Sequence, residues 1–159
     1  AYYPNMINSL ILESTRLGID KEEEKRNRIK NDNMNSLEIL NNYSLFIKNW
    51  EGKSFFKKQK KRNLKEWVRQ KNNRKSQNPK QLALSVKYLG LGKMPKFRNE
   101  FIKFNFPIYI INGSEDNTYV KIGKEIRRLN KNVVQYIIND ANHNTHIEKL
   151  DDYVNIISS

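Results

Sequence analysis

The stretch from Pro107 to His146 constrains the fold of this chain more than any other part of the sequence. It contains an apolar run, Ile108–Ile111, followed by a polar turn and then by the pattern of a helix over Val120–Leu129. A second apolar run, Val133–Ile138, comes next. Short apolar runs that alternate with an amphipathic helix are typical of a parallel β-α-β unit. The sequence therefore predicts an α/β fold with a parallel sheet.

Two residues suited to acid–base chemistry follow these two runs. Asp116 comes just after the turn at Asn112-Gly113, and His143 lies a few residues beyond the second run. Catalytic groups of parallel sheets lie beyond the carboxyl ends of the strands, and α/β-hydrolases place the acid and then the histidine of a triad in this order. We therefore predict Asp116 and His143 as a catalytic pair, with a helix cap as the alternative role of Asp116. His146 is the competing histidine, which we expect to pack or hydrogen-bond at the start of the last helix.

Residues 19–104 show helical patterns and no convincing strand. Asp20, with Glu23 three residues later, predicts an N-cap with a capping box. Apolar residues at spacings of three and four indicate an amphipathic helix that reaches Trp50. The whole stretch is too long for a connecting loop. We expect a core formed by residues 1–18 and 105–159, with residues 19–104 inserted as a helical cap, or lid.

Charge and cysteine content exclude several kinds of protein. The chain has 159 residues, no cysteine and a net charge of +13. Without cysteine there is no disulfide framework, which fits a reducing compartment, and no apolar run approaches the roughly 20 residues of a membrane span. The charge alone suggests a polyanionic partner. However, the lysines are spread along an asparagine-rich chain without any nucleic-acid-binding motif, as an AT-rich genome would produce. We therefore expect no nucleic acid or membrane partner, and keep a basic binding module as an alternative.

Several short motifs together identify a family through their order and spacing. They are LILESTRLGI at 10–19, RIKND at 28–32, FIKNW at 46–50, RKSQNP at 74–79, GLGKMP at 90–95, NGSED at 112–116 and ANHNTHIE at 141–148. With them the chain resembles, from end to end, the 2-succinyl-6-hydroxy-2,4-cyclohexadiene-1-carboxylate synthases of menaquinone and phylloquinone biosynthesis. The resemblance implies the C-terminal part of an α/β-hydrolase fold, with the serine of the nucleophile elbow and the oxyanion-hole loop expected before Ala1.

The resemblance also implies a reaction and its residues. The family is a carbon–oxygen lyase that eliminates pyruvate from 2-succinyl-5-enolpyruvyl-6-hydroxy-3-cyclohexene-1-carboxylate without a metal or cofactor. A serine made basic by His143 and Asp116 would remove a ring proton. Arg28 and Arg74 would bind substrate carboxylates, since a guanidinium can do so in bidentate fashion, and Trp50 would line the site. The alternatives are a solvated helix face for the arginines and core packing for the tryptophan.

The expected partners are a small molecule with several carboxylates and the missing N-terminal half of the same fold. Without that half, the isolated chain is expected to be inactive. The family implies a cytoplasmic location or the plastid stroma. The main alternative function is another α/β-hydrolase, such as an esterase, which would keep Asp116 and His143 but would not need arginines in the cap.

Overall fold

The chain divides into two compact units. The computed structural model describes residues 3–158, without the side chains of residues 54, 55 and 57. One unit, the core unit, combines Ala1–Leu17 with Phe97–Ser159, and the other, the cap unit, is Gly18–Lys96. The cap unit is thus an insertion within the core unit, and each is described by itself below.

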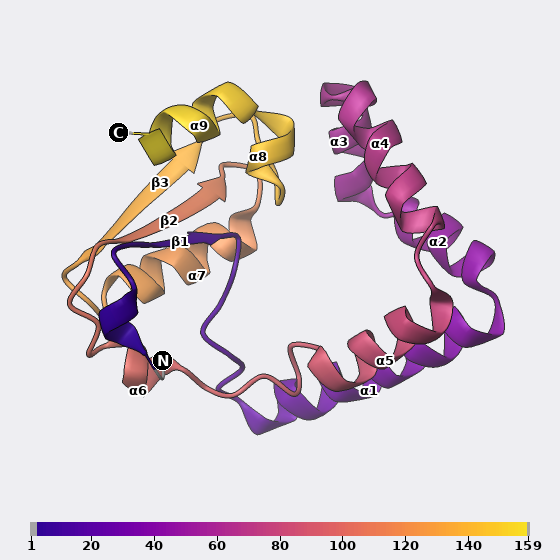
Figure 1. Ribbon diagram of the computed structural model, residues 1–159, viewed down its shortest axis with the longest axis horizontal. Coiled ribbons are helices and arrows are strands. Elements are labelled where there is room, and N and C mark those ends of the chain that lie inside the picture. The colour runs from indigo at the N-terminus through magenta and orange to yellow at the C-terminus, as the bar shows by residue number, and fades with distance from the viewer. Residues whose placement is uncertain (1–2, 159) are drawn as a thin grey trace. The chain divides into compact units, whose positions relative to one another are not determined.

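Parallel strands form the centre of the core unit. They are β1 (Leu10–Glu13), β2 (Ile108–Gly113) and β3 (Val133–Ile138), hydrogen-bonded in that order (Figure 1). Leu10 lies opposite Ile108, and Ile108 lies opposite Val133, so all three strands start level. Such runs of isoleucine, leucine and valine suit the pleated, buried strands of a parallel sheet. The predicted parallel α/β arrangement is confirmed.

Short helices surround this sheet. They are the 3-10 helix η1 (Pro4–Met6), α6 (Arg98–Phe101), α7 (Asn117–Arg127), α8 (Thr145–Glu148) and α9 (Leu150–Ser158). Lys149, with φ −145°, separates α8 from α9, so His146 lies in α8 and not at the start of the last helix. None of the described helices is long and apolar enough to span a membrane.

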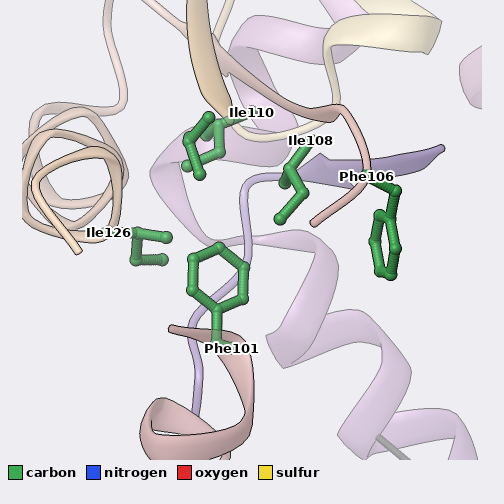
Figure 2. Packing of buried hydrophobic residues seen from close by; sticks show 6 residues of the cluster. Phe101, Phe106, Ile108, Ile110 and Ile126 are labelled. Carbon is green, nitrogen blue, oxygen red and sulfur yellow. The ribbon is translucent and has the colours of Figure 1, made fainter. Parts of the chain in front are cut away.

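The two faces of the sheet pack against different helices. On one face, Ile108 and Ile110 form a cluster with Phe101 of α6 and Ile126 of α7 (Figure 2). On the other face, Ile111 packs with Ile138 and Ala141 and is covered by apolar side chains of α9. Because successive side chains of a strand point to opposite faces, the continuous apolar run in β2 supplies both clusters. That is why β2 is the central strand.

The boundary between the units differs from the one expected at residue 104. Residues 97–104 belong to the core unit, because Phe101 is fully buried in the sheet cluster and Phe104 packs against it. Asn130 also ties this segment down, as its Nδ2 donates to the carbonyls of Phe101 and Phe104, at 2.9 Å each. The Phe97 N–H donates to the Leu17 carbonyl at 2.9 Å, which closes the insertion at its base.

Within the described residues, the cap unit consists of helices and the loops between them, without a strand. Its helices are α1 (Glu22–Asn41), α2 (Tyr43–Glu51), α3 (Ser54–Arg62), α4 (Leu64–Lys75) and α5 (Pro79–Leu89). Asn42 accepts a hydrogen bond from the Leu45 N–H at the start of α2, so the amphipathic stretch that reaches Trp50 is divided between two helices. The expected capping box is wrong: the N-cap of α1 is Lys21, without a side-chain cap bond. The lysine-rich α3 was not predicted.

We predict that Asn78→Ala destabilises the protein by about 1 kcal/mol, the usual contribution of an N-cap side chain. Asn78 Oδ1 accepts from the backbone N–H groups of Lys80 and Gln81, at 3.0 and 3.2 Å, and Pro79 at the first helical position adds no donor of its own. Thermal unfolding of the variant checks this. Lys80→Ala, an exposed change next to the cap, is the control and should leave the midpoint unchanged; equal midpoints for both variants would contradict the prediction.

Candidate active site

The core unit brings Asp116 and His143 into contact. Asp116 Oδ2 lies 2.7 Å from His143 Nδ1, across the ends of β2 and β3. Because a carboxylate can only accept, this hydrogen bond places a proton on Nδ1 and leaves Nε2 as the proton-accepting nitrogen. The Tyr119 ring lies edge-on to the imidazole, with 4.8 Å between ring centroids. The side chain of Asp116 is 11% exposed and that of His143 is 37% exposed, so the base is more accessible than the acid.

Asp116 is also a helix cap, the alternative role considered for it. It is the N-cap of α7, and its Oδ1 accepts from the Tyr119 N–H at 3.2 Å. One oxygen therefore starts the helix while the other contacts the histidine. A helix N-terminus also favours negative charge, so a carboxylate suits this position.

The NGSED motif holds the histidine loop against the end of β2. Ser114 Oγ accepts from the Asp140 N–H at 3.1 Å, and the Glu115 N–H donates to the Ala141 carbonyl at 3.0 Å. Gly113 packs directly on the loop backbone: a Cβ there would lie 2.1 Å from the Asn142 carbonyl oxygen. Only glycine fits at this approach, which accounts for the Asn-Gly pair in the motif.

Backbone strain occurs at the ends of two strands. Ser14 follows β1 with φ 39°, and Asp140 follows β3 with φ 53°. Positive φ costs a non-glycine residue about 1 kcal/mol or more, and such strain concentrates at functional sites. Ser14 Oγ is also buried and makes no hydrogen bond among the described residues. Both residues lie at the carboxyl edge of the sheet, where the Asp116–His143 pair is found.

His146 makes a second contact between a carboxylate and an imidazole. Its Nδ1 lies 2.7 Å from Glu13 Oε2, at the end of β1. The ring also lies edge-on to Tyr153 of α9, at 5.9 Å between centroids. Burial, and next the Glu13 charge, raise the pKa of Tyr153, so its phenol stays neutral beside this pair. His146 thus packs and hydrogen-bonds, as its position predicted.

The cap unit contains its own pocket, and the three predicted substrate residues line it together. The pocket has a volume of about 520 Å³, and its lining includes Arg28 of α1, Trp50 of α2 and Arg74 of α4. Ile39, Phe46, Leu82 and Val86 contribute apolar surface. Apolar walls with a few charged groups are typical of sites for small molecules.

Arg28 is the more accessible of the two predicted arginines. Asp32 Oδ1 and Oδ2 accept from Arg28 Nε at 2.8 and 3.0 Å, and the Arg28 side chain is 43% exposed, against 7% for Asp32. Gly90 leaves room for the aspartate, since a Cβ there would lie 2.4 Å from Asp32 Oδ2. Asp32 therefore holds the Nε edge, and the edge formed by Nη1 and Nη2 is the one suited to a ligand carboxylate.

Arg74 is held more tightly. Glu51 Oε1 accepts from Arg74 Nε at 3.1 Å and lies 3.0 Å from Nη2, at an angle that makes no hydrogen bond with Nη2. The Arg74 side chain is 19% exposed and that of Glu51 is 10% exposed. Tyr43 donates to the Arg74 carbonyl; burial raises the pKa of that phenol, and the Arg74 charge lowers it by less. Arg74 is therefore already paired inside the cap.

Trp50 belongs to an aromatic cluster at the pocket. Its ring stacks on Phe46 at 5.8 Å and lies tilted to Phe56 at 6.3 Å. Lys53 Nζ lies 3.7 Å above the Trp50 ring. Trp50 therefore packs within the cap unit and also lines the pocket.

Sequence reasoning missed the carboxylates that pair with Arg28, His146 and Arg74. Asp32 lies four residues after Arg28 inside RIKND, and Glu13 ends the strand within LILESTRLGI, so both belonged to motifs already noted. Glu51 gave no signal, because its partner Arg74 is distant in sequence. Within residues 3–158, no group of three or more histidine, aspartate or glutamate side chains could hold a metal ion.

Known structures share this arrangement of strands and helices. The structure of MenH from S. aureus matches 99% of this chain and 61% of its own chain, with a TM-score of 0.91 and 27% sequence identity. A thermophilic esterase from Thermogutta terrifontis matches 98% of this chain and 56% of its own, with a TM-score of 0.75. The chain has the α/β-hydrolase fold. At 17% identity, the esterase supports that α/β-hydrolase fold alone.

A curated relative supports the same resemblance. A Bacillus subtilis protein, provisionally named 2-succinyl-6-hydroxy-2,4-cyclohexadiene-1-carboxylate synthase, is 28% identical in an alignment of 150 residues. The match covers 92% of this chain and 54% of the relative. No protein-family model matches the chain. The chain thus spans about half the length of this curated relative. Together with the MenH structure, the match confirms the predicted resemblance of this α/β-hydrolase chain to the synthases.

Proposed function

We propose that the chain takes part in eliminating pyruvate from 2-succinyl-5-enolpyruvyl-6-hydroxy-3-cyclohexene-1-carboxylate. The observation that carries the proposal is the presence of two chemically distinct sites in one chain that resembles the synthases. One is an acid–histidine pair, Asp116 and His143, and the other is a pocket lined by Arg28, Trp50 and Arg74. The proposal assigns both sites to one reaction on one substrate.

His143 is the central residue of the proposed chemistry. With Nδ1 hydrogen-bonded to Asp116, Nε2 accepts the proton of a serine hydroxyl, and the carboxylate stabilises the imidazolium that forms. The serine oxygen then takes a proton from the ring, the ring double bond shifts, and the ring C–O bond to the enolpyruvyl group breaks. The departing enolate takes up the proton held by the imidazolium and leaves as pyruvate. In the family pattern this serine lies outside the residues that match the present chain. The proposal therefore includes a further segment of the same fold that supplies it.

The edge of the sheet supports such a segment. Among the described residues, β1 pairs only with β2, so its other edge is open. Ile11 of β1 is 40% exposed. Strands of parallel sheets are normally buried on both faces, and an open, apolar edge favours pairing with another strand. We propose that strands of the same α/β-hydrolase fold pair there.

The cap pocket favours a substrate with carboxylates over an uncharged ester. Arg28 presents a guanidinium beside apolar walls, and a hydrogen bond between charged groups contributes about 1.5–3 kcal/mol. Arg74, paired with Glu51, would act through its remaining donors or by shaping the wall. The alternative function, an esterase, rests on the Asp116–His143 pair and on the fold shared with the Thermogutta esterase.

The test is to supply the chain with the segment of the Bacillus subtilis relative that it does not match, and to measure pyruvate release. We predict that Arg28→Gln raises KM about 10- to 100-fold, because it removes a charge-assisted hydrogen bond to the substrate. Arg26→Gln, an exposed change on the same helix, is the matched control and should leave KM unchanged. Hydrolysis of an uncharged ester that is indifferent to Arg28, without pyruvate release, would favour the esterase instead.

A further inference from the structure

A carboxylate at the end of β1 has no part in the proposed reaction. Glu13 Oε1 accepts from Thr145 Oγ1 at 2.5 Å and from the His146 N–H at 3.0 Å. Glu13 Oε2 lies 2.7 Å from His146 Nδ1. Thr145 is fully buried and the side chain of Glu13 is 19% exposed. One carboxylate therefore holds a hydroxyl, a backbone amide and an imidazole of the segment that follows His143.

A second carboxylate holds the segment that precedes His143. Glu148 Oε2 accepts from the Asn142 N–H at 3.1 Å, and Glu148 is 8% exposed. Asn142 directly precedes His143 in the chain. His143 thus lies between two points at which a buried or nearly buried carboxylate fixes the loop. One anchor is in the loop, at Asn142, and the other is at Thr145 and His146, where α8 begins. His143 itself has no strand or helix ladder to order its backbone, so these anchors set the position of its side chain.

We propose that Glu13 is a positioning residue for His143. By holding Thr145 and the His146 amide, it keeps the His143 imidazole within reach of Asp116. Asp116 contacts the His143 ring through Nδ1, the nitrogen next to Cγ, so this bond depends on where the loop backbone places the side chain. The catalytic meaning of this inference rests on the proposed function, whereas its structural part, an ordered His143, does not.

A competing assignment exists, in which Glu13 and His146 form the working acid–histidine pair. The carboxylate–Nδ1 distance is 2.7 Å in both pairs, so distance does not separate them. The other contacts of Glu13 distinguish the two assignments. The Thr145 hydroxyl and the His146 backbone amide are donors that need an acceptor and not a charge. Glutamine at position 13 keeps an oxygen for both donors and removes the charge, so it separates anchoring from acid–base chemistry.

The first measurement is NMR of histidine-labelled protein, using the 159-residue chain. Because the chain has two histidines, His146→Gln assigns both signals. We expect a downfield, slowly exchanging Nδ1 proton for His143 in wild type, Glu13→Gln and His146→Gln. Glu13→Ala should broaden or lose this signal, and Thr145→Val should weaken it. If Glu13→Ala unfolds the chain, the Thr145→Val result decides.

The second measurement is pyruvate release by the assembled enzyme. Displacing a catalytic group by about 1 Å can cost on the order of 100-fold, so Glu13→Ala should lower kcat by about that factor with KM nearly unchanged. Glu13→Gln and His146→Gln should keep most of the activity. The proposal would be overturned if the His143 Nδ1 proton signal were unchanged in both Glu13→Ala and Thr145→Val. It would also be overturned if Glu13→Gln and His146→Gln released pyruvate as poorly as Glu13→Ala. A wild type that releases no pyruvate refutes the proposed function, while the NMR result still decides the role of Glu13.

Discussion

Replacing Asp116 by asparagine should lower kcat by about 10⁴-fold while leaving the folded protein intact. Asparagine caps helices as well as aspartate does, so its amide oxygen can still accept from the Tyr119 N–H and start α7. Its amide nitrogen, however, would face His143 Nδ1 and favour the wrong tautomer of the imidazole, which is the known cost of this change in an acid–histidine pair. The Asp116→Asn variant should therefore lose activity without losing stability.

The measurement is pyruvate release together with thermal unfolding, in the same assembled enzyme. His143→Ala is the positive control and should be at least as inactive as Asp116→Asn, because loss of the histidine of such a unit costs more than loss of its aspartate. Asp140→Asn, on the same loop, is the negative control: asparagine also tolerates positive φ. An Asp116→Asn enzyme that retains activity would show that Asp116 serves only as the cap of α7.

Gly113→Ala should destabilise the protein by about 3 kcal/mol, at the upper end of the usual cost of overpacking. The added Cβ would lie 2.1 Å from the Asn142 carbonyl oxygen and 2.3 Å from that of Ala141. Both obstacles are backbone atoms, so the clash cannot be relieved by turning a side chain. The histidine loop must move, and we therefore expect activity to fall together with stability.

Chemical denaturation and the His143 proton signal check this prediction. Gly52→Ala is the matched control, because Gly52 has φ −72° and an added Cβ would approach its neighbours no closer than 3.3 Å. At such a position alanine costs little and can stabilise by reducing the entropy of the unfolded chain. Equal stability of the two alanine variants would mean that the loop yields easily and does not hold His143.

The core unit was more predictable than the site because its signals are local. The apolar runs of β2 and β3 are themselves the strands that they predict. The order of Asp116 and His143 along the chain was enough to expect their contact. Asp20 shows the limit of such reasoning: it has the right residue type for an N-cap, yet α1 begins after Lys21. The Lys96 ammonium contacts the Asp20 carbonyl and the Glu22 carboxylate there, and no local pattern reports that contact.

Contacts between distant residues were not predictable from one sequence. Glu13 and Thr145 are 132 positions apart, and Arg74 and Glu51 are 23 apart, so no helical or strand periodicity relates them. The pairing of Arg74 with Glu51 follows from the packing of α2 with α4, which depends on side-chain fit. The lysine-rich α3 was missed for a different reason: its composition indicates a solvated run, whereas the buried Phe56 and Gln59 face the unit.

The hydrogen bond between the Phe97 N–H and the Leu17 carbonyl has an evolutionary consequence. It brings the entry and exit points of the inserted helices together, and insertions with closely spaced ends can be exchanged without disturbing their host. If residues 18–96 were removed, residues 14–17 and 97–107 would still join β1 to β2. That length is enough for the crossover of about a dozen residues that parallel strands require. The helical insertion is therefore a replaceable module: a lineage could acquire a new ligand preference by exchanging residues 18–96 while inheriting the acid–histidine pair unchanged.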